Sequence, residues 1–104
     1  MKFRHIKPVT MGTVKWKIYK MKDYAVVFTY SFDTYVAVYL FDTLLEAREF
    51  LFKSYKEELR IDAEENGWNS EGYIQEDGMY AKITNHFQDK DDDVTKFHIA
   101  NVYC

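Results

Sequence analysis

Apolar and polar side chains alternate in three early segments of the chain, which is the period of a β-strand that buries one face. Residues 14–20 read VKWKIYK and residues 24–32 read YAVVFTYSF, with an apolar or aromatic side chain at every second position. Residues 34–41 read TYVAVYLF and are rich in the β-branched and aromatic side chains that are frequent in strands. The three segments are predicted to form a meander of strands joined by short turns.

The period then changes to that of an α-helix over residues 42–67. Thr43 and Glu46 have the spacing of a capping box, and Gly67 can adopt the left-handed conformation that ends a helix. An apolar stripe on the helical wheel is formed by Leu44, Ala47, Leu51, Phe52, Tyr55 and Leu59. The segment is therefore predicted to be one amphipathic helix of about six turns, at 3.6 residues per turn.

Two more alternating runs lie on either side of Asp77–Gly78, a dipeptide that is typical of β-hairpin turns, and a last run covers residues 95–103. The order of elements is thus βββ-α-βββ, with short connections and one helix. This order predicts a single α+β domain over residues 1–104. In it, one long amphipathic helix packs on one face of a mostly antiparallel sheet, which gives two layers.

Cysteine content and apolar runs bear on where the protein works. The only cysteine is Cys104, which excludes an internal disulfide and predicts a reducing compartment, the cytoplasm. No apolar run approaches the ~20 residues that a membrane-spanning helix needs, so no membrane contact is expected.

Charge is distributed unevenly along the chain. Residues 1–22 carry seven bases and no acid, whereas residues 23–104 carry the other seven bases and all 17 acids, a net charge of −10. Lys15, Lys17 and Tyr19 share one face of the first predicted strand, and bases beside an aromatic ring suit a phosphate backbone and a stacked nucleobase. A nucleic-acid-binding protein is therefore one alternative. The overall net charge of −3 opposes it, because phosphate neutralisation drives such binding.

The sequence contains none of the motifs that indicate catalysis or a cofactor. Its three serines do not lie in a G-x-S-x-G turn, and its four glycines are too scattered to form a phosphate-binding loop. The chain is therefore predicted not to be an enzyme and to use no cofactor. A small-ligand-binding or enzymatic domain is the third alternative.

Residues 86–98, HFQDKDDDVTKFH, contain the D-x-D-x-D spacing of a calcium-binding loop. The glycine and the bidentate glutamate that complete such a loop are replaced by Val94 and Ala100, so no calcium site is predicted. A hairpin explains the run better, because its aspartates would then occupy a solvated turn, where they accept local backbone hydrogen bonds.

Pairing apolar with apolar side chains in that hairpin places Phe87 opposite Phe97, and the same register places His86 opposite His98. The two histidines are an alternative zinc site. Because zinc uses three or four protein ligands and the pair supplies two, no metal site is predicted.

Three residues of the predicted helix are candidates for protein binding. Phe50 and Ile61 lie together beside the apolar stripe, and Arg48 lies within it. Either the fold covers Phe50 and Ile61, or they form an apolar patch with a charged rim, as interaction surfaces do.

Three segments carry a resemblance to a group of proteins: FDTLLEAREFL at residues 41–51, EDGMYAKIT at 76–84 and FHIANVY at 97–103. Together they resemble small uncharacterised proteins of mobile elements or phages in Gram-positive bacteria, over roughly residues 35–104. The resemblance implies no catalytic residues and implies action by binding another protein. The predicted function is thus a protein-binding module that acts on a host protein or on a second copy of itself.

Overall fold

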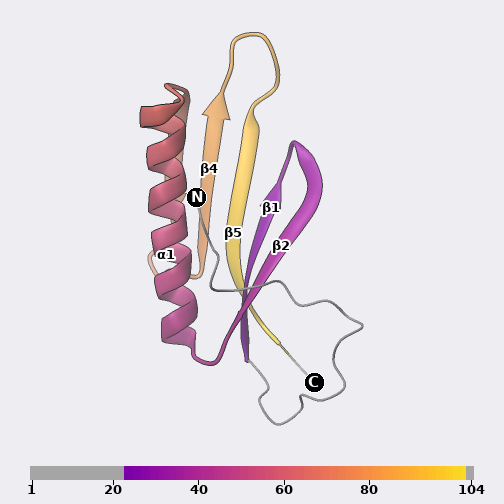
Figure 1. The fold of residues 1–104 in the computed structure, drawn as a ribbon, viewed down its shortest axis with the longest axis vertical. Helices are drawn as coiled ribbons and strands as arrows, with labels where there is room; N and C mark the ends of the chain where they lie inside the picture. The colour runs from indigo at the N-terminus through magenta and orange to yellow at the C-terminus, as the bar shows by residue number, and fades with distance from the viewer. Residues whose placement is uncertain (1–22, 103–104) are drawn as a thin grey trace.

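The structure, a computed structural model, describes residues 23–102. Within this range five strands form one sheet, and one long helix packs on one of its faces (Figure 1). The predicted α+β class, the antiparallel sheet and the two-layer arrangement are confirmed. The strand predicted at residues 14–20 lies outside the described residues. No helix in the described part of the chain is long and apolar enough to cross a bilayer.

The strand order is β2-β1-β5-β4-β3, and all neighbouring strands are antiparallel. The strands are β1 Tyr24–Tyr30, β2 Asp33–Phe41, β3 Asn69–Ile74, β4 Tyr80–His86 and β5 Asp93–Asn101. The last strand, β5, is central because it pairs with β1 on one side and with β4 on the other. It thereby joins the hairpin before the helix to the hairpin after it.

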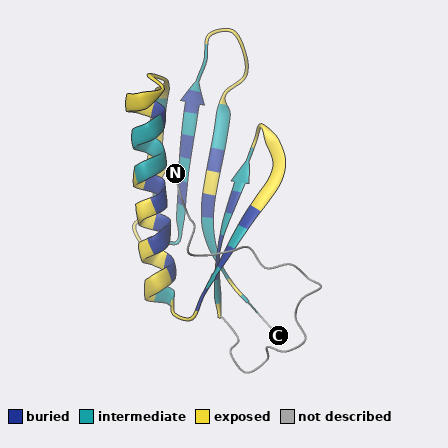
Figure 2. Ribbon diagram, viewed as in Figure 1, coloured by how far each residue is buried: buried dark blue, intermediate teal, exposed yellow. Residues whose placement is uncertain are grey.

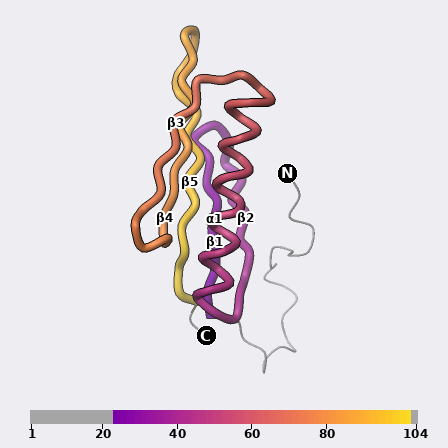
Figure 3. The backbone as a smooth tube through the Cα atoms, turned by 90° about the vertical axis from the view of Figure 1, so that its left-hand side faces the viewer, coloured from indigo at the N-terminus to yellow at the C-terminus, as the bar shows by residue number. Residues whose placement is uncertain are grey.

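The helix α1, Leu44–Arg60, continues into a π-helical turn, η3, Ile61–Glu65. Thr43 Oγ1 accepts a hydrogen bond from the backbone N–H of Glu46 at 3.1 Å, and Gly67 has the left-handed φ of 67°. The start and end of the helical segment were therefore predicted correctly. Seen from the side, α1 runs along the length of the sheet (Figure 3).

The face of α1 that contacts the sheet is not centred as predicted. Phe50 is buried, and its ring centroid lies 5.2 Å from that of Tyr39 and 5.0 Å from that of Phe41. Phe52, predicted within the buried stripe, is 47% exposed. The two side chains lie about 100° to either side of Leu51 on the wheel, so either can border the core. The aromatic rings of β1 and β2 fill the space on the Phe50 side. Figure 2 shows the buried residues of α1 on the side that faces the sheet.

The turn between β3 and β4 forms where Asp77–Gly78 predicted it. Gly78 has a φ of 73°, and Asp77 Oδ1 accepts a hydrogen bond from the Met79 backbone N–H at 3.0 Å. The side chain of Asp77 and the freedom of glycine at positive φ together stabilise the turn.

The predicted register of β4 and β5 is wrong. Phe97 lies opposite Ala81, and His98 lies opposite Tyr80, which shifts the pairing by six positions. Because six is even, Phe97 stays on the helix side, where it contacts Phe28 and needs no partner at Phe87. Residues 87–92 form the loop instead (Figure 1).

Candidate functional site

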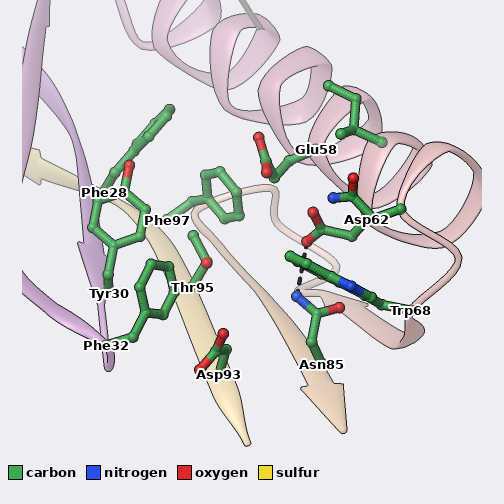
Figure 4. A pocket seen from close by; sticks show the side chains of 12 residues that line it. Phe28, Tyr30, Phe32, Glu58, Asp62, Trp68, Asn85, Asp93, Thr95 and Phe97 are labelled. Carbon is green, nitrogen blue, oxygen red and sulfur yellow. Dashed lines mark hydrogen bonds between the residues drawn. The ribbon is translucent and has the colours of Figure 1, made fainter. Parts of the chain in front are cut away.

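A cavity of about 300 Å³ lies where the last turn of α1 and η3 face β1, β5 and β4 (Figure 4). Its walls combine aromatic rings with carboxylates, one hydroxyl and one amide. The lining residues are Phe28, Tyr30, Phe32, Glu58, Ile61, Asp62, Asn66, Trp68, Asn85, Asp93, Thr95 and Phe97.

The helical wall of the cavity carries Glu58 and Asp62, which are four residues apart and therefore project from the same side of the helical segment. Asp62 is only 4% exposed. Burial raises the pKa of Glu58, and the negative charge of Asp62 raises it further. Both effects disfavour the ionised carboxylate of Glu58.

Two consecutive hydrogen bonds, from β3 to β4 and from β4 to the helical segment, hold the side chain of Asp62 in position. Ser70 on β3 donates from its hydroxyl to the side-chain oxygen of Asn85 on β4. The amide of Asn85 then donates to Asp62 Oδ2 at 2.9 Å (Figure 4). Because the Asn85 oxygen accepts from Ser70, its nitrogen is the group directed at Asp62. The carboxylate is thus held as an acceptor at the cavity wall.

The opposite wall is aromatic and opens to solvent at the β1–β2 turn. Tyr30 packs against Phe32 with ring centroids 5.4 Å apart, and against Tyr35 with centroids 6.4 Å apart. Burial, and after it the charges of neighbouring groups that include Glu58, raises the pKa of Tyr30 to about 12. The phenol therefore stays protonated at neutral pH and can donate a hydrogen bond to a ligand.

Trp68 closes the other side of the cavity, directly after the helical segment. Its backbone N–H donates to the Asp62 carbonyl oxygen at 2.9 Å, and its ring packs edge-on against Phe87 at 5.4 Å. The indole is still 41% exposed. Phe87, which was predicted to pair with Phe97, thus supports the cavity wall instead.

Thr95 lies in the floor of the cavity, beside Phe97 on β5 (Figure 4). The residue is only 6% exposed, and its hydroxyl forms no hydrogen bond with any residue that the structure describes. The hydroxyl borders the cavity, so a ligand there can form a hydrogen bond with it.

The candidate protein-binding residues do not form one surface. Phe50 is in the core, which is the first of the two alternatives given for it, so it does not belong to an exposed patch. Ile61 is half-buried and lines the cavity. Arg48 is exposed near the start of α1, beside Gly78 in the β3–β4 turn, at the other end of the helix.

The two histidines do not face each other, so the geometry behind the alternative zinc site is wrong. His86 lies between Glu71 and Asp92, with each of its ring nitrogens 3.0 Å from a carboxylate oxygen. Hydrogen bonding to Glu71, followed by the charge of Asp92, raises the pKa of His86. Across residues 23–102 no three side chains of His, Cys, Asp or Glu are grouped so as to hold a metal ion.

Lys15, Lys17 and Tyr19 lie outside the described residues, so their role stays a prediction. The open face of the described sheet has a basic pair of its own, because Lys82 on β4 lies directly opposite Lys96 on β5.

Glu58 and Asp62 were not singled out from the sequence, although the sequence contained a signal for them. Asp62 lies eleven residues after Leu51 and seven after Tyr55, which are helical repeats of two buried positions. Glu58 lies seven residues after Leu51. Acids that continue a buried stripe point to a polar site at that end of the helix.

Comparison of the chain with known protein families, with curated proteins and with solved structures found no match. The resemblance to proteins of mobile elements or phages therefore stays a prediction.

Proposed function

We propose that the protein is a non-enzymatic binding module, which recognises another protein by accepting one of its side chains in the cavity. The supporting observation is a group of exposed aromatic side chains at the cavity mouth and beside it. Phe32 and Trp68 line the cavity, and Tyr35 stacks on the lining residue Tyr30. Phe32, Tyr35 and Trp68 are 56%, 54% and 41% exposed. Rings of this kind bury a large area at low entropy cost and are enriched at protein interfaces.

The size of the cavity favours a side chain over a free metabolite. Sites for drug-sized ligands measure about 300–1,000 Å³, and this cavity is at the lower limit. One long side chain can enter such a volume, and the exposed rings can then contact the backbone around it. An anchor residue in a pocket, surrounded by rings that exclude water, is how interface hot spots are built.

A peptide-display selection on the immobilised full-length chain tests this proposal. Selected peptides should bind the unmodified chain and lose at least about tenfold in affinity for Phe32→Ser or Trp68→Ser, the range seen for aromatic anchors. Tyr73→Ser is the matched control, because Tyr73 is an aromatic residue of 50% exposure that does not line the cavity. Affinity should be unchanged in that variant.

Two other outcomes would refute the proposal or identify a different partner. Peptides that bind the Phe32→Ser and Trp68→Ser variants as tightly as the unmodified chain would place the binding surface elsewhere and refute the proposal. A second copy of the chain is the alternative partner at the same site. If light scattering detects a dimer and Phe32→Ser converts it to a monomer, the partner at this site is a second copy of the chain.

Nucleic-acid binding is a second candidate, favoured by the Lys82–Lys96 pair. Like charges directly opposite each other destabilise a sheet, and neither lysine has an ion pair among residues 23–102. Tyr73 lies opposite Lys82 on β3, so an aromatic ring adjoins the bases. Retardation of single-stranded DNA at low salt that Lys82→Ala with Lys96→Ala abolishes would support this function. Unretarded DNA would rule it out.

A further inference from the structure

We infer that the side chain accepted by the cavity is that of an arginine, so that the partner is recognised through a guanidinium group held between carboxylates and aromatic rings. This inference deepens the proposed function and depends on it. Four properties of the cavity lead to it: its charge, the unpartnered hydroxyl in its floor, its aromatic walls, and the way that its acceptors are spread.

All ionised side chains that line the cavity are acidic. Glu58, Asp62 and Asp93 contribute carboxylates, and no lysine, arginine or histidine is among the lining residues. Asp93 is paired with Lys90, whose Nζ lies 3.4 Å from its Oδ2, so the charge of the cavity comes from Glu58 and Asp62. The nearest helical base, Arg60, is engaged elsewhere, because its Nη2 lies 2.7 Å from Glu57 and 3.0 Å from Glu65. The helical wall of the cavity is therefore electronegative and disfavours anions.

A cation in the cavity would offset two unfavourable features of its helical wall. Glu58 and Asp62 are like charges one helical turn apart, and both are at least partly withdrawn from water. A positive charge between the walls would favour the ionised form of Glu58. The surrounding rings lower the local dielectric, which strengthens the attraction between a cation and these carboxylates.

Thr95 provides an observation that is independent of the acids. Its hydroxyl, on a residue 6% exposed, faces the cavity without a partner among the described residues. An N–H donor from the ligand would satisfy it. The acceptors thus lie on different elements, with Glu58 and Asp62 on the helical wall and Thr95 in the floor on β5 (Figure 4).

This spread of acceptors favours guanidinium over ammonium. A guanidinium has five N–H donors in a planar fork, whereas an ammonium concentrates its three donors at one point. The flat group also stacks on aromatic faces, and Phe32, Tyr30 and Trp68 supply such faces at the mouth.

Titration of the full-length ¹⁵N-labelled chain with ethylguanidinium chloride tests the inference. Saturable shifts are expected for the amides of Asp62 and Thr95 and for the indole of Trp68. Ethylurea, the neutral analogue, should bind at least about tenfold more weakly, as should ethylguanidinium to Glu58→Gln, because charge-assisted hydrogen bonds are lost. Glu49→Gln removes the same charge from an exposed position of α1, and affinity should stay within about twofold.

Two analogues of ethylguanidinium and a pH series give the results that would contradict the inference. Equal affinity for ethylurea excludes a charged ligand, and equal affinity for ethylammonium excludes the choice of guanidinium. If Glu58→Gln unfolds, the pH dependence of the unmodified chain decides. Ethylguanidinium binding should weaken as pH falls and Glu58 is protonated, and binding that does not change with pH contradicts the inference.

Failure here and failure of the proposed function are distinguishable with the selected peptides. Replacing arginine by citrulline in such a peptide removes the charge and keeps the shape. If a peptide still needs Phe32 but binds equally well with citrulline, the inference that the cavity accepts arginine is wrong. The proposed function, recognition of a protein at the cavity, is then still supported. Loss of binding with citrulline supports both.

Discussion

His86 connects β4 to two other parts of the chain through ion pairs. It lies on β4, and its ring nitrogens contact Glu71 on β3 and Asp92 in the β4–β5 loop at 3.0 Å each. The ion pairs form only when the imidazole is protonated, so the connection depends on pH. These ion pairs could not be predicted from the sequence, because they depend on the register of β3 with β4 and on the path of the β4–β5 loop.

We predict that His86 stabilises the fold at mildly acidic pH and not at alkaline pH. The pKa of His86 is raised in the folded protein, first by hydrogen bonding to Glu71. A raised pKa gives stability that is complete below the unfolded value, about 6.5, and is lost as pH rises through the folded value. His86→Gln should therefore lower the free energy of unfolding at about pH 5.5 and have little effect at about pH 8.5.

Urea denaturation at the two pH values measures this difference. His98→Gln is the control, since His98 is on the same face of the sheet but has no ion pair with any described residue. A destabilisation by His86→Gln that is the same at both pH values would show that the imidazole acts by packing and not by charge.

The helix α1 shows how an element is positioned by its neighbours. Its apolar residues cover more than one side of the wheel, and the aromatic rings of β1 and β2 determine which of them are buried. Phe50 packs on Phe28, Tyr39 and Phe41, while Phe52 is half-exposed beneath Lys56. The same rotation of the helix turns Glu58 and Asp62 toward the cavity. The position of the helix therefore fixes the core and the candidate site together.

We predict very different costs for truncating the two phenylalanines. Phe50→Ala should destabilise the fold by about 3–5 kcal/mol, because it removes a buried ring and leaves a cavity. Phe52→Ala should cost less than about 1 kcal/mol, as expected for an exposed position. Guanidinium chloride denaturation gives both values, with Phe50→Leu as a milder substitution if Phe50→Ala does not fold. A larger cost at Phe52 would mean that the helix packs with the stripe predicted from the sequence.

At the scale of the whole molecule, acidic groups gather at the end that holds the cavity. Residues 57–65 contain five acids and one base, and residues 89–93 contain four acids and one base. Both segments lie at the same end of the molecule, the upper end in Figure 1. Charge of one sign around a concave site raises the local concentration of oppositely charged ligands and speeds their association.

We predict that the acidic β4–β5 loop, residues 87–92, raises the association rate of a basic peptide but does not contact the bound peptide. Asp89→Asn with Asp91→Asn should lower the association rate constant by about two- to fivefold at low salt and leave the dissociation rate nearly unchanged. Stopped-flow measurements on a selected arginine-containing peptide test this. The difference should vanish at about 0.5 M salt, where surface charges are screened.

Glu49→Gln with Glu76→Gln is the matched control, because it removes the same charge from exposed positions in the first two turns of α1 and in the β3–β4 turn. Equal slowing by this control would mean that net charge alone governs association. A change confined to the dissociation rate of the loop variant would mean that the loop contacts the bound peptide.

Local signals in the sequence were sufficient to determine most of the elements. The Thr43 cap, Gly67, and the Asp77–Gly78 turn act through hydrogen bonds and backbone conformation within a few residues, and all three are found where predicted. Alternation of apolar and polar residues likewise gave the strands of the described sheet and the α+β class.

The tertiary structure alone decided the strand order, the β4–β5 register, the rotation of α1 and the existence of the cavity. Each of these depends on contacts between segments far apart in the chain, such as Phe50 with Phe41 or Asn85 with Asp62. The sequence pattern permits two rotations of the helix and several even-numbered registers, because all of them bury apolar faces. Packing of the aromatic rings selects one combination, and that combination brings two acids, a free hydroxyl and the exposed rings together.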